Sequence, residues 1–368
     1  MYSPKEYLKH GLFLVLTILA STLAGAEWVY GKSIMVSGEN ALTWDYFLKS
    51  FAYSIPFIGI LLVHELGHLF TSIHHKVKCT LPFFIPAWFG FIGAPSIGTL
   101  GAIIRMKGFV NSRKKLFDIG VAGPLAGFVV AIGVLIYGFT HLPPTDYILE
   151  IHPEYADPNF QGYEDAIDFE LGQNLLFWMM SESLADPEKM PEMSEIIHYP
   201  FLFAGYLALF FTALNLLPIG QLDGGHVIFG LFPKYHRQIS LVTFSAFLMY
   251  AGLGIISPYH PANELFFRIP LYVGFLYISY HKSGLSVQNK LALALGIAAI
   301  QYALVFFQPT WQGYQGWLLF AFLLGRVMGI RHPEVSGCKP LDFKRKLIGW
   351  LAILIFALCF SPQPFIFN

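Results

Sequence analysis

Cysteine and charged residues are both scarce in this chain of 368 residues. The 3 cysteines, Cys79, Cys338 and Cys359, are too few for the disulfide framework of a small secreted protein. Charged residues make up only 12% of the sequence, whereas hydrophobic residues make up 55%. This balance, with a mean hydropathy of +0.56, excludes an ordinary soluble domain. The composition therefore predicts an integral membrane protein that crosses the lipid bilayer several times.

The few charges are segregated along the chain, although the formal net charge is +0. Between Asp146 and Glu195 lie 13 of the 23 acidic residues, with Lys189 as the only base. The stretch 74–115 instead carries seven Lys or Arg residues and no acid. By the positive-inside rule, we expect the basic stretch to face the cytosol and the acidic loop 143–199 to face outward. Neither block requires nucleic acid as a partner.

Apolar runs alternate with basic loops in a way that predicts about nine transmembrane helices. The runs lie near residues 12–29, 44–70, 117–142, 200–217, 239–257, 269–280, 291–307, 316–330 and 347–360. The first could instead belong to a signal peptide, because Ala24-Gly25-Ala26 resembles a cleavage site, but a retained helix is favoured. Segment 81–106 is apolar yet rich in Pro and Gly, which favours a re-entrant strand or loop over a helix. The predicted fold is an all-α polytopic membrane protein with this one exception.

The motif His64-Glu65-Leu66-Gly67-His68 lies inside the apolar run 51–70. Residues four apart share one face of a helix, so His64 and His68 can bind one Zn²⁺ while Glu65 activates the zinc-bound water as general base. Ionisable residues are costly in a spanning segment unless they are paired or coordinated, which favours a functional site over a helix end at the interface. Gly67 would let metal, water and substrate approach the helix. The motif predicts metal-assisted hydrolysis at bilayer depth.

Catalytic zinc usually has three protein ligands and a water molecule, so a third ligand is expected. Asp223 is the best candidate, because it follows an inward-running helix and so reaches the same side of the membrane as the two histidines. Neighbouring Pro and Gly residues would break that helix and let the backbone fold against the metal, although Asp-Gly-Gly alone would indicate an ordinary turn. As ligands, His226 and Cys79 are weaker candidates, better explained as a polar residue at a helix start and a reduced thiol. Asn215 could contact the substrate carbonyl or the oxyanion, or could be a satisfied polar residue between helices.

Two motifs, HELGH at 64–68 and NLLPIGQLDGG at 215–225, resemble those of the site-2 proteases, which are integral-membrane zinc metalloproteases. The Gly-rich stretch between them and FDIGVAGP at 117–124 are also similar to that family, so the resemblance covers roughly residues 50–230. It implies one Zn²⁺ per chain, bound by His64, His68 and Asp223, with Glu65 as catalytic base and Asn215 as a substrate or transition-state contact. It also implies that segment 81–106 forms membrane-embedded strands that hold the substrate extended. The acidic loop leaves no room for a PDZ domain.

The resemblance implies an intramembrane zinc metalloprotease whose substrates are single-span membrane proteins, with the active site toward the cytosolic side. We expect three parts: an N-terminal transmembrane helix and external loop (1–50), a protease core that includes the acidic loop (51–238), and C-terminal transmembrane helices (239–368). The alternative is a catalytically silent or transport-type metal-binding membrane protein. Glu65 argues against silence, because coordination alone would not require it. The scarcity of ionisable residues in the C-terminal helices argues against transport.

Overall fold

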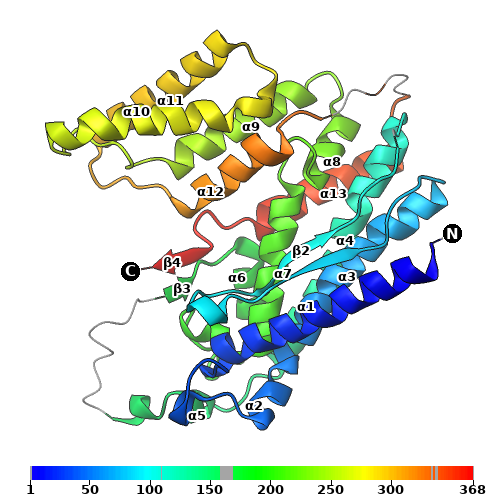
Figure 1. Cartoon of the computed structure of the whole chain (residues 1–368), viewed down its shortest axis with the longest axis vertical. Helices are drawn as coiled ribbons and strands as arrows, with labels where there is room; N and C mark the ends of the chain where they lie inside the picture. Colours follow the sequence, from blue (N-terminus) through cyan, green and yellow to red (C-terminus); the bar gives the residue numbers. More distant parts are fainter. Residues whose placement is uncertain (1, 109, 158–168, 333–334, 336–338, 368) are drawn as a thin grey trace. The chain divides into compact units, whose positions relative to one another are not determined.

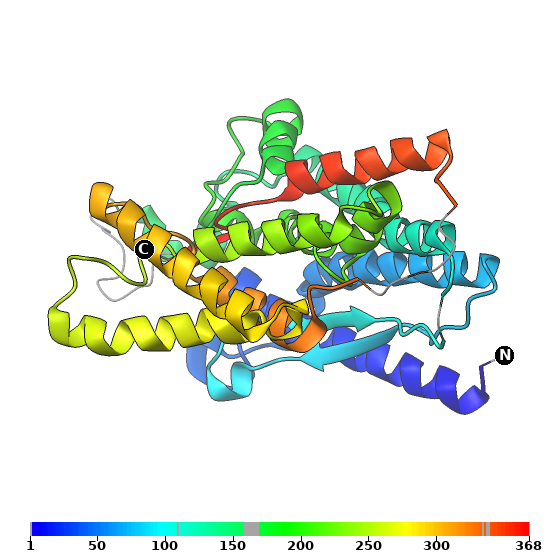
Figure 2. The ribbon, with the colours of Figure 1, turned by 90° about the horizontal axis from the view of Figure 1, so that it is seen from above.

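The computed structural model describes residues 2–108, 110–157, 169–332, 335 and 339–367. Helices dominate this part of the chain, and two small antiparallel sheets accompany them (Figures 1 and 2). The chain divides into two compact units. The first comprises Met1–Val110, Val121–Asn215 and Leu351–Asn368, and the second comprises Asn111–Gly120 and Leu216–Trp350.

The first unit begins with a long helix, α1 (Pro4–Tyr30), whose ends carry clear signals. Ser3 and Glu6 form a capping box at its start, and Gly31 ends it with a left-handed φ of 61°. The remaining helices and strands of this unit are α2 (Trp44–Lys49), α3 (Phe51–His74), β1 (Phe83–Ala87), β2 (Gly98–Ile103), most of α4 (Arg113–Thr140), α5 (Tyr147–Ile151), β3 (Phe169–Leu171), α6 (Leu175–Leu184), α7 (Pro200–Leu216), the end of α13 (Phe343–Cys359) and β4 (Phe365–Phe367). Short 3₁₀ turns join them, namely η1 (Gly38–Asn40), η2 (Gly90–Ile92), η3 (Pro153–Ala156) and η4 (Glu195–His198).

The regular elements in the described part of the second unit are all helices, which loops connect. This unit contains the first turns of α4 and the first half of α13, together with α8 (Asp223–Leu231), α9 (His236–Ala251), α10 (Ala262–Ser279), η5 (His281–Ser283), α11 (Val287–Phe307), α12 (Gly316–Phe322) and η6 (Leu323–Met328). The segment η6 is a π-helix that continues α12 without interruption.

Every apolar run that the sequence predicts to cross the bilayer contains a helix, namely α1, α3, α4, α7, α9, α10, α11, α12 with η6, and α13. Four described helical stretches are long and apolar enough to span a membrane: Pro4–Tyr30, Trp44–His74, Arg113–Thr140 and Val287–Phe307. Two shorter apolar helices are Pro200–Leu216 and Gly316–Met328. The mainly helical, membrane-type fold is therefore confirmed, whereas the number of nine crossings stays a prediction.

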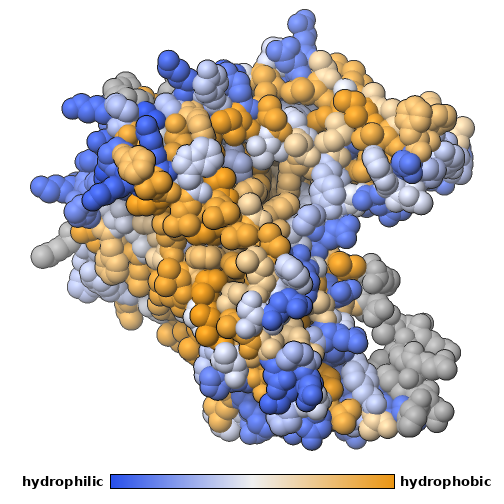
Figure 3. All heavy atoms as spheres, turned by 180° about the vertical axis from the view of Figure 1, so that it is seen from behind, coloured by the Kyte–Doolittle hydropathy of each residue, from blue (hydrophilic) through white to orange (hydrophobic). Residues whose placement is uncertain are grey.

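Helix α1 carries apolar side chains on an exposed face and small or hydroxyl side chains on a buried face. Leu8, Leu12, Val15 and Leu19 recur at helical spacing and are 76%, 54%, 53% and 40% exposed. Small or hydroxyl residues such as Ser21 on the other face are fully buried. An apolar outside with a small-residue inside suits a helix in lipid, because burial of apolar surface cannot drive helices together there. Figure 3 shows apolar side chains gathered in a broad field on one face of the molecule.

The segment predicted to be re-entrant contains a β-hairpin. Strands β1 and β2 pair antiparallel from Phe83↔Ile103 to Ala87↔Gly98, and an irregularity lies between Phe84 and Pro86. The hairpin lies along α1 in both ribbon views, and β2 also contacts α3 (Figures 1 and 2). Gly98 makes this approach possible, because a Cβ there would lie 2.1 Å from the Cα of Ser21 in α1. The predicted strands are present, and their re-entry into a membrane stays a prediction.

A second pair of strands was not expected from the sequence. Strands β3 and β4 pair antiparallel, so the acidic loop 143–199 is joined to the C-terminal segment of the first unit. The hydroxyl of Tyr206 in α7 donates to the carbonyl of Pro364 at 2.6 Å and so supports this pairing. The fold therefore differs from the all-α expectation in having this second sheet. Each strand is only three residues long, too short for period-two alternation to appear in the sequence.

Candidate active site

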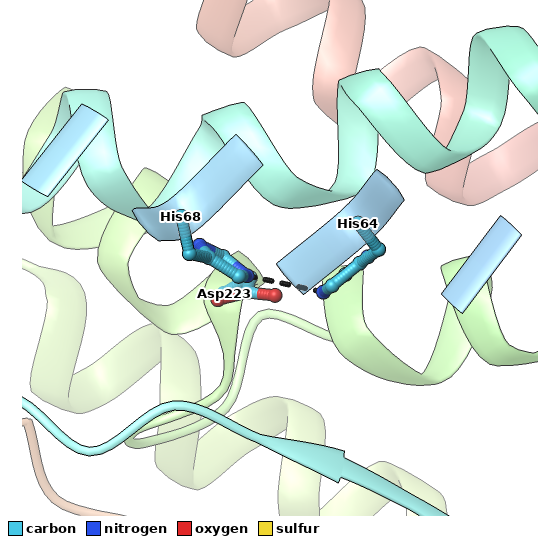
Figure 4. Close-up of side chains that lie close together, drawn as sticks. All are labelled: His64, His68 and Asp223. Carbon is cyan, nitrogen blue, oxygen red and sulfur yellow. Dashed lines mark hydrogen bonds between the residues drawn. The ribbon is translucent and has the colours of Figure 1, made fainter. Parts of the chain in front are cut away.

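The two histidines of the HELGH motif face each other on α3. Their Nε2 atoms lie 3.0 Å apart, and their rings meet at 73° (Figure 4). His64 and Glu65 are both 7% exposed, which is rare for ionisable side chains on an apolar helix. The predicted helical spacing of the motif is thus present, with both imidazoles directed to one point.

Glycines of α4 bring its backbone against these imidazoles. A Cβ at Gly123 would lie 2.2 Å from Nε2 of His68, and a Cβ at Gly127 would lie 3.1 Å from Cβ of His64. Any larger residue at Gly123 would occupy the space of the His68 ring. The small residues at 122–127, predicted to allow close helix packing, therefore also define the walls around the histidine pair.

Gly67 has a different role from the one that the sequence indicates. A Cβ at this position would lie 2.6 Å from the carbonyl oxygen of Ala122 in α4. The missing side chain therefore admits the backbone of a neighbouring helix, rather than metal, water or substrate. The expectation of an open approach at Gly67 is wrong, because the flank of α3 at this residue is the one packed against α4.

Asp223, the proposed third ligand, is the first residue of α8 in the second unit. The chain between α7 and α8 folds so tightly that glycine is required at several positions. A Cβ at Gly224 would lie 2.0 Å from the carbonyl oxygen of Leu216, and one at Gly225 would lie 2.2 Å from that of Gly220. Gly220 itself has a left-handed φ of 55°. The glycines thus allow close backbone packing within this turn. The carboxylate of Asp223 at the start of α8 also interacts favourably with the positive end of the helix dipole.

Among the described residues, two groups of His and Asp or Glu side chains are candidates to hold a metal ion. His64 and His68 belong to one of these groups, and its third member, Asp223, lies in the other unit, so binding of one ion by all three side chains stays a prediction. His226 is in neither group, and its Nδ1 lies 2.8 Å from Nε2 of His332. Cys79 is buried, forms no disulfide and belongs to neither group, whereas Cys338 lies outside the described residues.

Asn215 lies near the C-terminal end of α7 and is half-buried. This position is compatible with a polar residue that faces a site, and equally with one that lies between helices. Its predicted contact with substrate therefore stays a prediction.

Two hydrogen-bonded side chains within the second unit do not stand out in the sequence. Arg113 is 8% exposed, and its guanidinium donates from Nε and Nη2 to the carbonyl of Gly230 at 2.9 and 2.6 Å, so it caps the C-terminal end of α8. Asp118 accepts two hydrogen bonds of 2.7 Å from Arg345. Arg113 is one of the basic residues of 74–115, and Asp118 lies in the FDIGVAGP stretch. Nothing in the neighbouring sequence indicates their partners, which are 117 and 227 positions away.

The family to which this histidine motif belongs follows from a comparison with known proteins. Residues 52–258, more than half of the chain, match the model of Peptidase family M50, the family of the site-2 proteases. The chain therefore belongs to this family, and the resemblance described above is confirmed.

Named relatives agree with this assignment. The chain is 33% identical over 213 residues to a probable zinc metalloprotease EGY1, chloroplastic, of Oryza sativa subsp. japonica. The aligned region covers 56% of this chain and 31% of the relative. It is likewise 33% identical over 200 residues to EGY1 of Arabidopsis thaliana, covering 52% of this chain and 30% of the relative. A probable zinc metallopeptidase EGY3, chloroplastic, of Arabidopsis thaliana is 27% identical over 255 residues, which is 63% of this chain and 41% of the relative. The matches thus span about a third of the relatives' length, and no solved structure matches the chain.

Proposed function

We propose that this protein is an intramembrane zinc metalloprotease that hydrolyses peptide bonds within transmembrane segments of membrane proteins. The observation that carries the proposal is the buried imidazole pair on the apolar helix α3, with Nε2 atoms 3.0 Å apart and Glu65 next to His64. Tetrahedral zinc with Zn–N bonds of about 2.0–2.1 Å places two ligand nitrogens about 3.3 Å apart. The pair therefore fits a zinc ion with little adjustment.

His64, His68 and Asp223 would bind the zinc, one ion per chain, as two nitrogens and one carboxylate oxygen. This ligand set leaves one position for water or substrate, as catalytic zinc sites require. When bound, zinc would polarise the substrate carbonyl and lower the pKa of a water molecule toward neutrality.

Glu65 acts as the general base in this proposal. Its carboxylate accepts a proton from the attacking water while the water oxygen bonds to the carbonyl carbon, and returns the proton to the amide nitrogen as the C–N bond breaks. Burial of Glu65 excludes bulk water that would compete for the proton. Asn215 would donate a hydrogen bond to the carbonyl oxygen as negative charge develops there.

A substrate helix must be unwound before cleavage, because its carbonyl groups are hydrogen bonded to amides four residues on. The hairpin offers an exposed strand for this step, since β2 belongs to a two-stranded sheet and contacts α3. Leu100 and Ile103 of β2 are 67% and 54% exposed, so apolar substrate side chains could pack beside them. An unwound substrate would pair with β2 as an added strand and recover backbone hydrogen bonds. Proline substitutions through 98–104 should therefore slow cleavage, whereas alanine substitutions at the non-glycine positions of this segment should not, and equal rates would remove this step.

The substrates would be single-span membrane proteins, and the protein would be a multi-pass membrane protein with its active site toward the cytosolic side. The basic residues of 74–115, which follow α3 directly, support this orientation. The division into residues 1–50, a core at 51–238 and C-terminal helices at 239–368 is part of the same proposal. The match of the family model to residues 52–258 supports its central part.

The decisive experiment incubates the purified protein with a model single-span substrate, with and without a zinc chelator. Glu65→Gln should keep zinc and lose cleavage by about 10²–10⁴-fold, because general-base catalysis contributes that much. Asp223→Asn and His68→Ala should lose the zinc ion of the active site as well. Glu182→Gln, at an exposed carboxylate of α6, is the matched control and should behave as wild type.

Two outcomes would overturn the proposal. A fully active Glu65→Gln variant would remove the assigned base. A wild-type protein that binds zinc and never cleaves would instead support the silent or transport-type alternative. Measurement of zinc flux into proteoliposomes would then distinguish a transporter from a silent protein.

A further inference from the structure

A second group of metal-type ligands lies outside the proposed active site, wholly within the first unit. His152 follows α5, and Glu195 and His198 are the first and last residues of η4. One ligand atom from each lies within 4.8 Å of the others. Their side chains are 26%, 20% and 10% exposed, so this is a largely enclosed cluster rather than a solvated acidic patch.

The spacing of the cluster matches that of a coordination sphere. Nε2 of His152 lies 3.2 Å from Nε2 of His198, and the rings meet at 79°. Oε2 of Glu195 lies 3.6 Å from Nε2 of His198. Ligand atoms around a tetrahedral zinc ion are about 3.3 Å apart, so both distances lie within a few tenths of an ångström of that value. The imidazole arrangement closely repeats that of His64 and His68.

Hydrogen bonds fix which ring nitrogens carry protons. Nδ1 of His198 lies 2.8 Å from the carbonyl oxygen of Val29, which can only accept, so this nitrogen donates. Nδ1 of His152 likewise donates to the carboxylate of Glu154 at 2.9 Å. In neutral imidazoles, both Nε2 atoms then carry lone pairs that face each other. Two such acceptors repel at 3.2 Å unless a cation lies between them, and histidine ligands of metals are typically held by this kind of Nδ1 bond.

The carboxylate of Glu195 provides an independent observation. Its Oε1 accepts a hydrogen bond from the hydroxyl of Tyr155 at 3.2 Å. Its Oε2 atom is buried from solvent and has no hydrogen-bond partner among the described residues. A buried carboxylate oxygen without a partner is costly, and here it lies beside the two imidazole nitrogens. A divalent cation would satisfy all three atoms at once.

We propose that His152, Glu195 and His198 form a second divalent-cation site, of the type that binds Zn²⁺ through two imidazoles and a carboxylate. A water molecule would complete the tetrahedron. Because His198 is also hydrogen bonded to Val29 near the end of α1, the ion would fasten the segment after α5 to η4 and, through His198, to α1. This site does not depend on the proposed protease activity.

The test counts zinc in the full-length protein in detergent, with the proposed catalytic zinc removed by His64→Ala/His68→Ala. After treatment with chelator and reloading with ZnCl₂, this background should retain about one ion per chain, measured by inductively coupled plasma mass spectrometry. Adding Glu195→Gln or His152→Ala should weaken zinc binding at least about 100-fold in competition with a chromophoric chelator, because even outer-shell changes cost 10–100-fold. Co²⁺ loaded in place of zinc should show a tetrahedral absorption spectrum that the same substitutions abolish.

His141→Ala is the matched control, since this exposed histidine at the end of α4 belongs to neither metal group. It should leave the zinc content unchanged. Glu195→Gln keeps the shape of the side chain, so loss of zinc with an unchanged circular dichroism spectrum cannot be attributed to unfolding. A background protein that binds no zinc, or one whose binding is unaffected by both Glu195→Gln and His152→Ala, would overturn the proposal. If the background protein binds no zinc, the imidazoles of His152 and His198 share a proton instead.

Discussion

Gly123 offers the sharpest test of how α4 shapes the histidine pair. A Cβ at this position would lie 2.2 Å from Nε2 of His68 and 2.5 Å from Cδ2 and Cε1. Ordinary contacts between such atoms are about 3.5–4.0 Å, so the imidazole of a Gly123→Ala variant must move by more than about 1 Å. Metal–ligand distances tolerate only about 0.2 Å. The substitution should therefore displace His68 from any zinc bound at His64.

The expected effect is a loss of zinc affinity of at least about 10–100-fold, the range found when the support of a metal ligand is changed. Peptide cleavage should fall by about 100-fold or more, as it does when a reacting group moves by 1 Å. Zinc affinity would be measured by competition with a chromophoric chelator, and cleavage with the model single-span substrate.

Gly133 provides the matched control on the same helix, because nothing lies within 4 Å of a Cβ built there. Both substitutions gain about 1 kcal/mol of helix propensity, so this contribution cancels between them. Gly133→Ala should bind zinc and cleave as the wild type does. If Gly123→Ala has the zinc affinity and activity of Gly133→Ala, the packing argument is wrong.

Two further predictions concern the hairpin and the second unit. Gly98→Ala should lower the melting temperature and slow cleavage more than Gly101→Ala does. Both glycines have positive φ, but only a Cβ at Gly98 would collide with the backbone of Ser21, since nothing lies within 4 Å of a Cβ at Gly101. Equal effects would show that only the backbone strain at positive φ matters. Replacing Asp118 by Asn and Arg345 by Met, singly and together, should give a coupling on the order of 1 kcal/mol in thermal unfolding, since the paired side chains are 16% and 31% exposed and their hydrogen bonds are charge-assisted. A coupling near zero would mean that the pair does not stabilise the second unit.

Local patterns in the sequence determine much of this protein. Each apolar run predicted to cross the bilayer contains a helix, because helix formation in such segments follows from composition and length. The pairing of His64 with His68 follows from helical geometry alone, since residues four apart must lie on one face. The Pro- and Gly-rich segment 81–106 forms strands for an equally local reason, namely that these residues disfavour a helix.

Features that depend on distant partners were decided by the tertiary structure. Gly67 was expected to let metal and substrate approach α3, but it instead admits the backbone at Ala122 in α4. The sequence alone does not determine which side of a helix a neighbouring helix will contact. The strand pair β3–β4 joins segments almost 200 positions apart. His152 and His198 are 46 positions apart, and neither is part of a ligand motif. Such contacts depend on the path of the intervening chain, which no local rule of spacing or periodicity determines.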